Sequence, residues 1–106
     1  MRFYKKLYIG ESIEKKKAKV IWKLKTRATL FDIYVIVYPK DGNEIEYFNS
    51  SFLKQKYYRK NKPMIIGIAK GIDETELLME KIILDTHQYT GNYDINQYFH
   101  NIKNVK

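Results

Sequence analysis

The stretch PMIIGIA at residues 63–69 has no polar side chain. A strand with one face in water alternates apolar and polar residues, whereas a strand covered on both faces is apolar throughout. We therefore predict that 63–69 is a central strand of a sheet. A glycine inside a strand often marks a place where another backbone or a bulky side chain comes close, and Gly67 predicts such a contact.

Further strands are predicted upstream. Residues 31–48, FDIYVIVYPKDGNEIEYF, indicate a β-hairpin whose turn is Asp41-Gly42, a pair that tolerates positive φ. Residues 2–10, RFYKKLYIG, indicate a strand that ends at Gly10. The alternation of that strand places Phe3, Leu7 and Ile9 on one face and Tyr4 and Tyr8 on the other.

Residues 11–30, ESIEKKKAKVIWKLKTRATL, fit two interpretations. In a helix, one apolar face would contain Ile13, Val20, Ile21, Leu24 and Ala28, with Lys17 inside it. In a strand, the alternating residues would be Val20, Trp22, Leu24 and Thr26 against Lys19, Lys23 and Lys25. The Val-Ile-Trp content favours a strand at 18–27, although both interpretations of residues 12–27 stay open.

The C-terminal part of the chain predicts two helices. Residues 73–91 have Asp73 as N-cap with Glu76 three positions later, and they end at Gly91. The main apolar face of this helix consists of Leu78, Met79, Ile82, Ile83 and Tyr89. Residues 94–104 have Asp94 and Gln97 as a cap pair, and their apolar stripe consists of Ile95, Tyr98, Phe99 and Ile102.

These elements predict one α+β domain over residues 1–106. We expect a four- or five-stranded, mainly antiparallel sheet with two C-terminal helices packed on one face. Residues 49–58 add a short helical turn with an Asn or Ser cap.

Leu77 and Leu84 lie seven residues apart on the side of the long helix away from its main apolar face. We expect the C-terminal helix to fold back and bury both leucines against Phe99. If it does not, a homodimer through Leu77, Leu84 and the C-terminal helix is expected.

Composition argues against most enzyme classes. The 106 residues contain no Cys, which excludes disulfides, thiol catalysis and Cys-ligated zinc. The P-loop, dinucleotide, HExxH and GxSxG motifs are absent as well. His87 and His100 are the only histidines, and surface or capping roles are favoured for them over metal binding. We expect no enzymatic activity, no cofactor and no metal.

No apolar run has the length of a membrane span or of a signal-peptide core. We therefore expect a cytoplasmic protein that does not associate with membranes.

Charge is distributed unevenly along the chain. The formal net charge is +8, and residues 1–62 hold 16 Lys/Arg against 6 Asp/Glu, while residues 63–106 hold 4 against 6. Such a basic half predicts attraction to an anionic partner. Genome composition is an alternative explanation, because Lys, Ile, Tyr and Asn have AT-rich codons and only 3 of the 20 cations are Arg.

Two basic segments hold the candidate nucleic-acid-binding residues. The first consists of Lys15, Lys16, Lys17, Lys19, Lys23, Lys25 and Arg27. The second consists of Lys54, Lys56, Tyr57, Tyr58, Arg59, Lys60 and Lys62. The cations would contact phosphates, and Tyr57 or Tyr58 would stack on a base.

Each segment also has a structural explanation. Lysines protect edge strands against aggregation, and a single tyrosine can anchor a solvated loop to the core. The hypothesis is a small non-enzymatic binding module, with a protein–protein adaptor as the alternative.

Three stretches, KLYIGESI, KVIWKLK and KYYRKNKPMIIGIAKGIDE, carry a resemblance to a family. Together they resemble small uncharacterised proteins encoded on conjugative transposons and similar mobile elements of low-GC Gram-positive bacteria. The resemblance covers residues 6–99. It implies a cytoplasmic bacterial protein with an accessory role near DNA transfer or its regulation, and it implies no active site.

Overall fold

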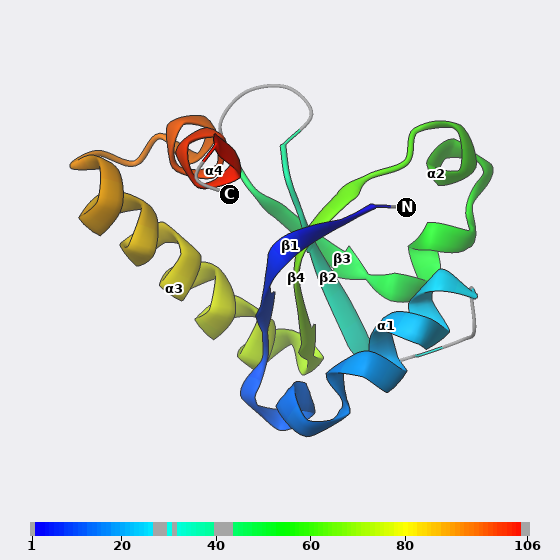
Figure 1. The fold of residues 1–106 in the computed structure, drawn as a ribbon. Helices are drawn as coiled ribbons and strands as arrows, with labels where there is room; N and C mark the ends of the chain where they lie inside the picture. Colours follow the sequence, from blue (N-terminus) through cyan, green and yellow to red (C-terminus); the bar gives the residue numbers. More distant parts are fainter. Residues whose placement is uncertain (1, 27–29, 31, 40–43, 105–106) are drawn as a thin grey trace.

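The structure, a computed structural model, describes residues 2–26, 30, 32–39 and 44–104, with side chains as far as Phe99. Four strands form one sheet in the order β1-β4-β2-β3 (Figure 1). The strands are β1 (Arg2–Ile9), β2 (Ile33–Val37), β3 (Glu46–Asn49) and β4 (Met64–Lys70). The predicted α+β class is confirmed.

The sheet is mixed, so the expectation of a mainly antiparallel sheet was wrong. β2 runs antiparallel to β3 and to β4, but β1 runs parallel to β4. The reason is that β1 pairs with the last strand instead of the next one in the chain. A long connection allows two strands to run parallel, which a tight hairpin does not.

Helices cover both faces of this sheet (Figure 1). One face packs against α3 (Gly71–Thr90) and α4 (Ile95–Asn104). The other face packs against a layer of short elements: η1 (Glu11–Lys16), α1 (Lys17–Lys25), η2 (Ser50–Lys54) and α2 (Lys56–Lys60). Two separate hydrophobic clusters result, one on each side of the sheet.

β4 lies in the interior of the sheet, as the apolar run predicted, and its residues Ile65 to Ala69 are buried. A Cβ atom at Gly67 would lie 3.1 Å from Ile36 Cδ1 and 3.4 Å from Leu78 Cδ2, so side chains from β2 and α3 press on this position. The two faces of β1 are also as predicted, since Tyr4 and Tyr8 pack on the α3 side and Phe3 on the other.

The predicted hairpin is present as the antiparallel pair of β2 and β3, in which Val35 lies opposite Phe48. The predicted Asp41-Gly42 turn lies outside the described residues. The predicted cap after β3 is present too, because the Asn49 side chain accepts a hydrogen bond from the Ser51 amide at 2.9 Å.

The strand favoured at 18–27 was wrong, because Lys17–Lys25 form the helix α1. Val20 and Leu24, one helical turn apart, are both buried under the sheet. A strand would have placed them on one face as well, so alternation did not separate the two interpretations. The segment is helical because its apolar residues cover the second face of the sheet, which would otherwise be exposed to water. Tertiary packing thus overrides the β propensity of Val, Ile and Trp.

The N-cap of α3 lies three residues earlier than expected, so the assignment of Asp73 as N-cap was wrong. Lys70 is the N-cap, and Asp73 lies in the first turn. The helix ends at Gly91 as predicted, with φ of 80° and an amide that donates to the His87 carbonyl. Its buried face is narrower than predicted and includes Thr75 and Thr86, whose hydroxyls donate to carbonyls four residues earlier.

α4 packs on the sheet and not on the outer side of α3. Its predicted cap is present, since Asp94 Oδ1 accepts from the Gln97 amide at 3.2 Å. Phe99 is fully buried and meets the rings of Tyr4 and Tyr38 edge-on, at 5.0 and 5.6 Å between centroids. The expected burial of Leu77 and Leu84 against Phe99 was therefore wrong: these leucines are 68% and 53% exposed. The predicted position Ile102 has no described side chain.

Candidate nucleic-acid interface

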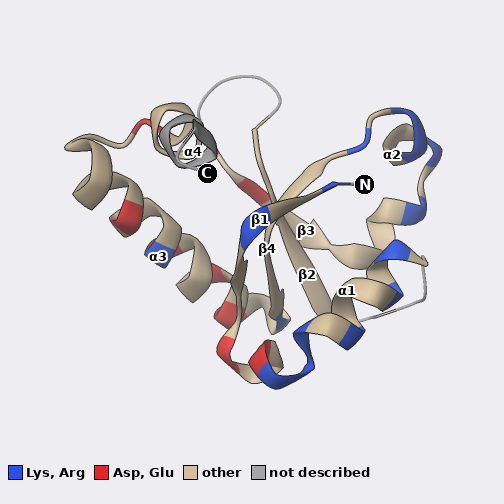
Figure 2. Cartoon of the chain, viewed as in Figure 1, with Lys and Arg blue, Asp and Glu red and all other residues tan. Residues whose placement is uncertain are grey.

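The short elements η1, α1, η2 and α2 form a basic layer, defined here as residues 11–26 and 50–62. Residues 11–26 contain six lysines and two glutamates, and residues 50–62 contain five cations and no acid. α3, on the opposite side of the sheet, contains five acidic residues and one lysine. Figure 2 shows the cations gathered on α1 and α2 and the acids along α3. The fold thus turns a charge asymmetry along the sequence into one across the molecule.

On α1, Val20 and Leu24 are buried, Ile21 packs beside them, and most of the lysines lie at the surface. The exposed candidates of this segment are Lys15, Lys16, Lys17, Lys19 and Lys25, while Lys23 is half-buried. Lys17 Nζ lies 3.7 Å from a Glu14 carboxylate oxygen, and Lys25 Nζ lies 5.6 Å from the centre of the Phe3 ring. The candidate Arg27 lies outside the described residues.

On α2, the two adjacent tyrosines have different environments. Tyr58 stacks on Phe48, with centroids 5.1 Å apart and ring planes at 26°, and packs against the core. Burial, with the neighbouring Tyr57 and Glu46, raises the pKa of Tyr58, so its phenol is neutral in this setting. Tyr57 meets Tyr58 edge-on and is 53% exposed. Only Tyr57 of the pair presents a large surface to a ligand.

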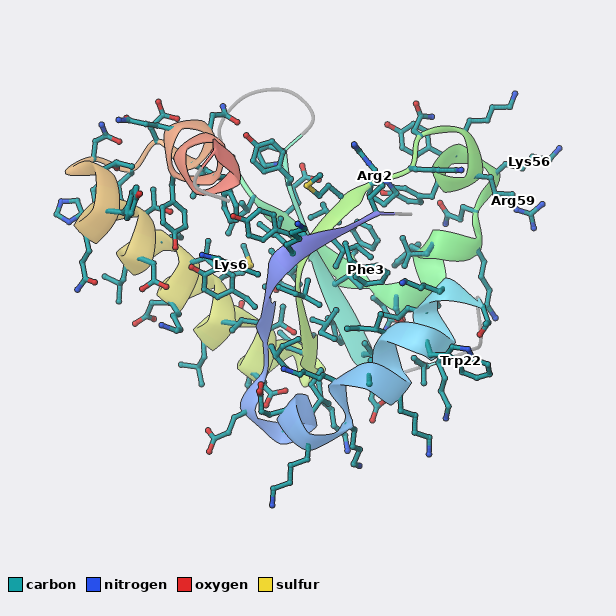
Figure 3. All side chains as sticks on the ribbon, viewed as in Figure 1. Arg2, Phe3, Lys6, Trp22, Lys56 and Arg59 are labelled. Atoms are coloured by element: carbon teal, nitrogen blue, oxygen red, sulfur yellow. The ribbon has the colours of Figure 1, made fainter. Side chains whose placement is uncertain are left out.

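Cations surround these tyrosines on the surface. The side chains of Lys54, Lys56, Arg59, Lys60 and Lys62 are all exposed, and Figure 3 shows Lys56 and Arg59 extending away from the sheet. A hollow of about 450 Å³ lies beside them, with Arg2 and Lys62 in its lining but also Glu44 and Glu46. Because carboxylates repel phosphate, the outer surface of the helices is a better anion site than this hollow.

Trp22 is the residue that the strand interpretation misplaced. A strand puts Trp22 on the face opposite Lys19 and Lys25, whereas in α1 it lies three residues from each and shares their side of the helix. Its side chain is 62% exposed and extends outward from α1 (Figure 3). If Val20 and Leu24 are interpreted as the buried face of a helix, the sequence places Trp22 at the surface beside the lysines.

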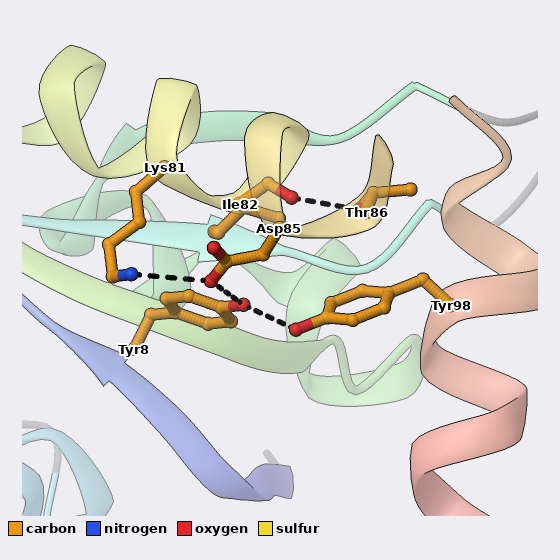
Figure 4. A network of polar contacts seen from close by, with 6 residues as sticks. All are labelled: Tyr8, Lys81, Ile82, Asp85, Thr86 and Tyr98. Atoms are coloured by element: carbon orange, nitrogen blue, oxygen red, sulfur yellow. Dashed lines mark hydrogen bonds and ion pairs between the residues drawn. The ribbon is translucent and has the colours of Figure 1, made fainter. Parts of the chain in front are cut away.

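A second polar cluster lies on the α3 side (Figure 4). The Tyr8 hydroxyl donates to Asp85 Oδ2 at 2.8 Å and shares a hydrogen bond of 2.8 Å with the Tyr98 hydroxyl. Lys81 Nζ lies 3.4 Å from the same carboxylate oxygen. These contacts join β1, α3 and α4.

The chemistry of this cluster is structural. Burial, followed by the hydrogen bonds with Tyr98 and Asp85, raises the pKa of Tyr8 far above its usual value. A phenol that acts as an acid or base near neutral pH requires the opposite shift. The raised pKa keeps the Tyr8 phenol protonated, and the hydrogen bond between Tyr8 and Tyr98 joins α4 to β1.

Of the two histidines, only His87 has a described side chain. His87 stacks on Tyr93 with ring centroids 4.7 Å apart, and the side chain of His100 is not described. Within the described part of the chain, no three His, Asp or Glu residues are grouped as a metal site requires. The helices of that part are also too short or too polar to cross a bilayer.

Comparisons with known proteins give no relative: no family model, curated protein or solved structure matches this chain.

Proposed function

We propose that this protein is a small non-enzymatic module that binds nucleic acid through its basic layer. The observation that supports it is the segregation of charge, with cations on α1 and α2 and acids on α3 (Figure 2). AT-rich codons account for many lysines, but they do not account for cations and acids on opposite sides of one sheet. In this module the exposed lysines contact phosphates and Tyr57 stacks on a base.

Binding through phosphates is tested by its salt dependence. The logarithm of the binding constant should fall linearly with the logarithm of salt concentration, with a slope of about −0.7 to −0.9 per phosphate contact. Replacing Lys19, Lys23 and Lys25 by Gln should flatten that slope by about 2 units. Stability should change by no more than about 1 kcal/mol, because the contact of Lys25 with the Phe3 ring is weak and Lys19 is exposed.

A matched variant separates a defined surface from general attraction by net charge. Lys5→Gln, Lys6→Gln and Lys81→Gln also remove three exposed lysines, but from outside the basic layer. This variant should keep the slope and affinity of the parent chain. Equal losses in both triple variants would contradict a defined interface on the basic layer.

An accessory role in DNA transfer of a mobile element, which the family resemblance implies, agrees with such a module and stays a prediction.

Leu77 and Leu84 support a second candidate role, a protein–protein contact. Both project from α3 on the side away from the sheet and are more than half exposed. A homodimer interface along these leucines would not include the apolar face of α4 that was expected to take part, because Phe99 on that face is buried in the core. Sedimentation of the parent and of Leu77→Ser/Leu84→Ser tests it. A parent that is monomeric at high concentration would exclude the dimer.

A further inference from the structure

Trp22 occupies an unusual position for a large apolar side chain. It is 62% exposed, and among the described residues no hydrogen bond or ring contact involves its indole ring. Exposed aromatics on the other side of the sheet differ in this respect, because Tyr89 meets Tyr98 edge-on and Tyr93 stacks on His87. The indole of Trp22 therefore contributes little to the fold.

The neighbours of Trp22 on α1 are cations. Lys19 and Lys25 lie three residues before and after it and share its side of the helix, and both are exposed. An exposed aromatic ring on a helix side that also carries lysines matches a nucleotide with a free base, because the base stacks on the ring while the flanking phosphates meet the cations.

We infer that the basic layer binds single-stranded nucleic acid, DNA or RNA, with Trp22 stacking on an unpaired base. This inference rests on the proposed function and names the class of nucleic acid for the same surface. In a duplex the faces of the bases are covered by their neighbours, so an exposed indole gains nothing there and only phosphate contacts remain.

A lipid surface fits α1 less well. A helix that lies in a membrane interface directs a whole apolar face into the lipid. α1 directs Val20 and Leu24 into the core instead, and Trp22 is left alone among lysines. A single indole supplies far less apolar area than such a helix requires.

Trp22 is the only tryptophan in the chain, so its intrinsic fluorescence reports on this position directly. The full chain is titrated at low salt with oligothymidylate, oligouridylate and a mixed-sequence duplex. Both single strands should quench Trp22, and comparison of the two separates DNA from RNA as the preferred ligand. Trp22→Ala should lower single-strand affinity about tenfold by anisotropy of a labelled strand and leave duplex affinity unchanged. Trp22→Phe should retain most of the affinity.

Leu77→Ala, a truncation of similar exposure on the acidic side, is the matched control and should change neither affinity. Equal binding of duplex and single strands, with no effect of Trp22→Ala, would overturn this inference and leave the phosphate contacts of the proposed function standing. No binding of any nucleic acid would overturn the proposed function itself. Anionic phosphatidylserine vesicles are added to the same complex. A blue shift of Trp22 emission with release of the oligonucleotides would overturn this inference and indicate a lipid surface as the ligand.

Discussion

The buried cluster around Phe99 and the exposed surface of the basic layer use aromatic residues in opposite ways. On the α3 side, Tyr4, Tyr98 and Phe99 are buried in a cluster of edge-on rings. On the basic layer, Trp22, Phe52 and Tyr57 present about half or more of their surface to solvent. The first set stabilises the fold through burial, whereas the second set leaves apolar area unused in the folded chain. A substitution in the first set should therefore lower stability, whereas a substitution in the second set should affect stability little and binding more.

The largest expected effect is that of Phe99→Ala. Phe99 is fully buried between Tyr4, Tyr38 and Tyr98, so its removal leaves a cavity that these rings fill only in part. We expect a loss of about 3–5 kcal/mol in the free energy of unfolding. Urea denaturation of Phe99→Ala and of Trp22→Ala compares the two sides directly. Similar destabilisation by both variants would show that Trp22 contributes to the fold as much as Phe99 does.

An intermediate effect is expected at the plane between the two sides. Gly67→Val introduces atoms where Ile36 and Leu78 already lie close to the Cβ position. We expect overpacking to cost about 1–3 kcal/mol, and we expect the basic layer to keep its affinity for nucleic acid because the strain falls on the α3 side. Thermal melting and a binding titration measure the two quantities. A melting temperature equal to that of the parent would show that the contacts relax freely.

The smallest effect is expected at the joint between the two layers. Glu74 of α3 accepts hydrogen bonds from the Ser12 amide at 2.7 Å, the Ser12 hydroxyl at 2.8 Å and the Lys70 amide at 2.6 Å. Burial opposes ionisation of this carboxyl, but the hydrogen bonds from Ser12 and Lys70 outweigh it, so its pKa lies below the usual 4.5. Glu74→Gln should cost on the order of 1 kcal/mol at neutral pH.

The pH dependence of this joint has a definite sign. A carboxyl with a depressed pKa in the folded state contributes stability above its unfolded pKa, and that contribution is lost as pH falls through the folded pKa. The parent should therefore lose stability below about pH 4.5 relative to Glu74→Gln. Denaturation at neutral and acidic pH measures the gap between the two proteins, and a gap that does not narrow in acid would contradict this account.

The same joint explains a glycine. A Cβ atom at Gly10 would lie 2.6 Å from Glu74 Oε2 and 3.0 Å from the Ala69 backbone. A residue without a side chain is therefore required where β1 ends and η1 begins. A Cβ atom at this position would displace the Glu74 carboxylate from Ser12. From the sequence Gly10 predicted only the end of a strand, whereas the contact that requires glycine comes from α3.

Part of the candidate interface was predictable and part was not. The two basic segments were found from charge alone, because side chains of lysine and arginine remain in water in almost any fold. The different environments of Tyr57 and Tyr58 were not, since they depend on Phe48 of a distant strand. Trp22 was missed because its neighbours on the surface change with the choice between helix and strand.

By itself the sequence determined the features that depend on local geometry. The buried strand β4, the two faces of β1, the pairing of β2 with β3 and the helix stop at Gly91 follow from periodicity and backbone preference. Tertiary structure alone decided that β1 pairs in parallel with β4, that residues 17–25 are helical and that α4 covers the sheet instead of Leu77 and Leu84. Each of these outcomes depends on which apolar surface far away in the sequence remains to be buried, and short-range patterns carry no information about that surface.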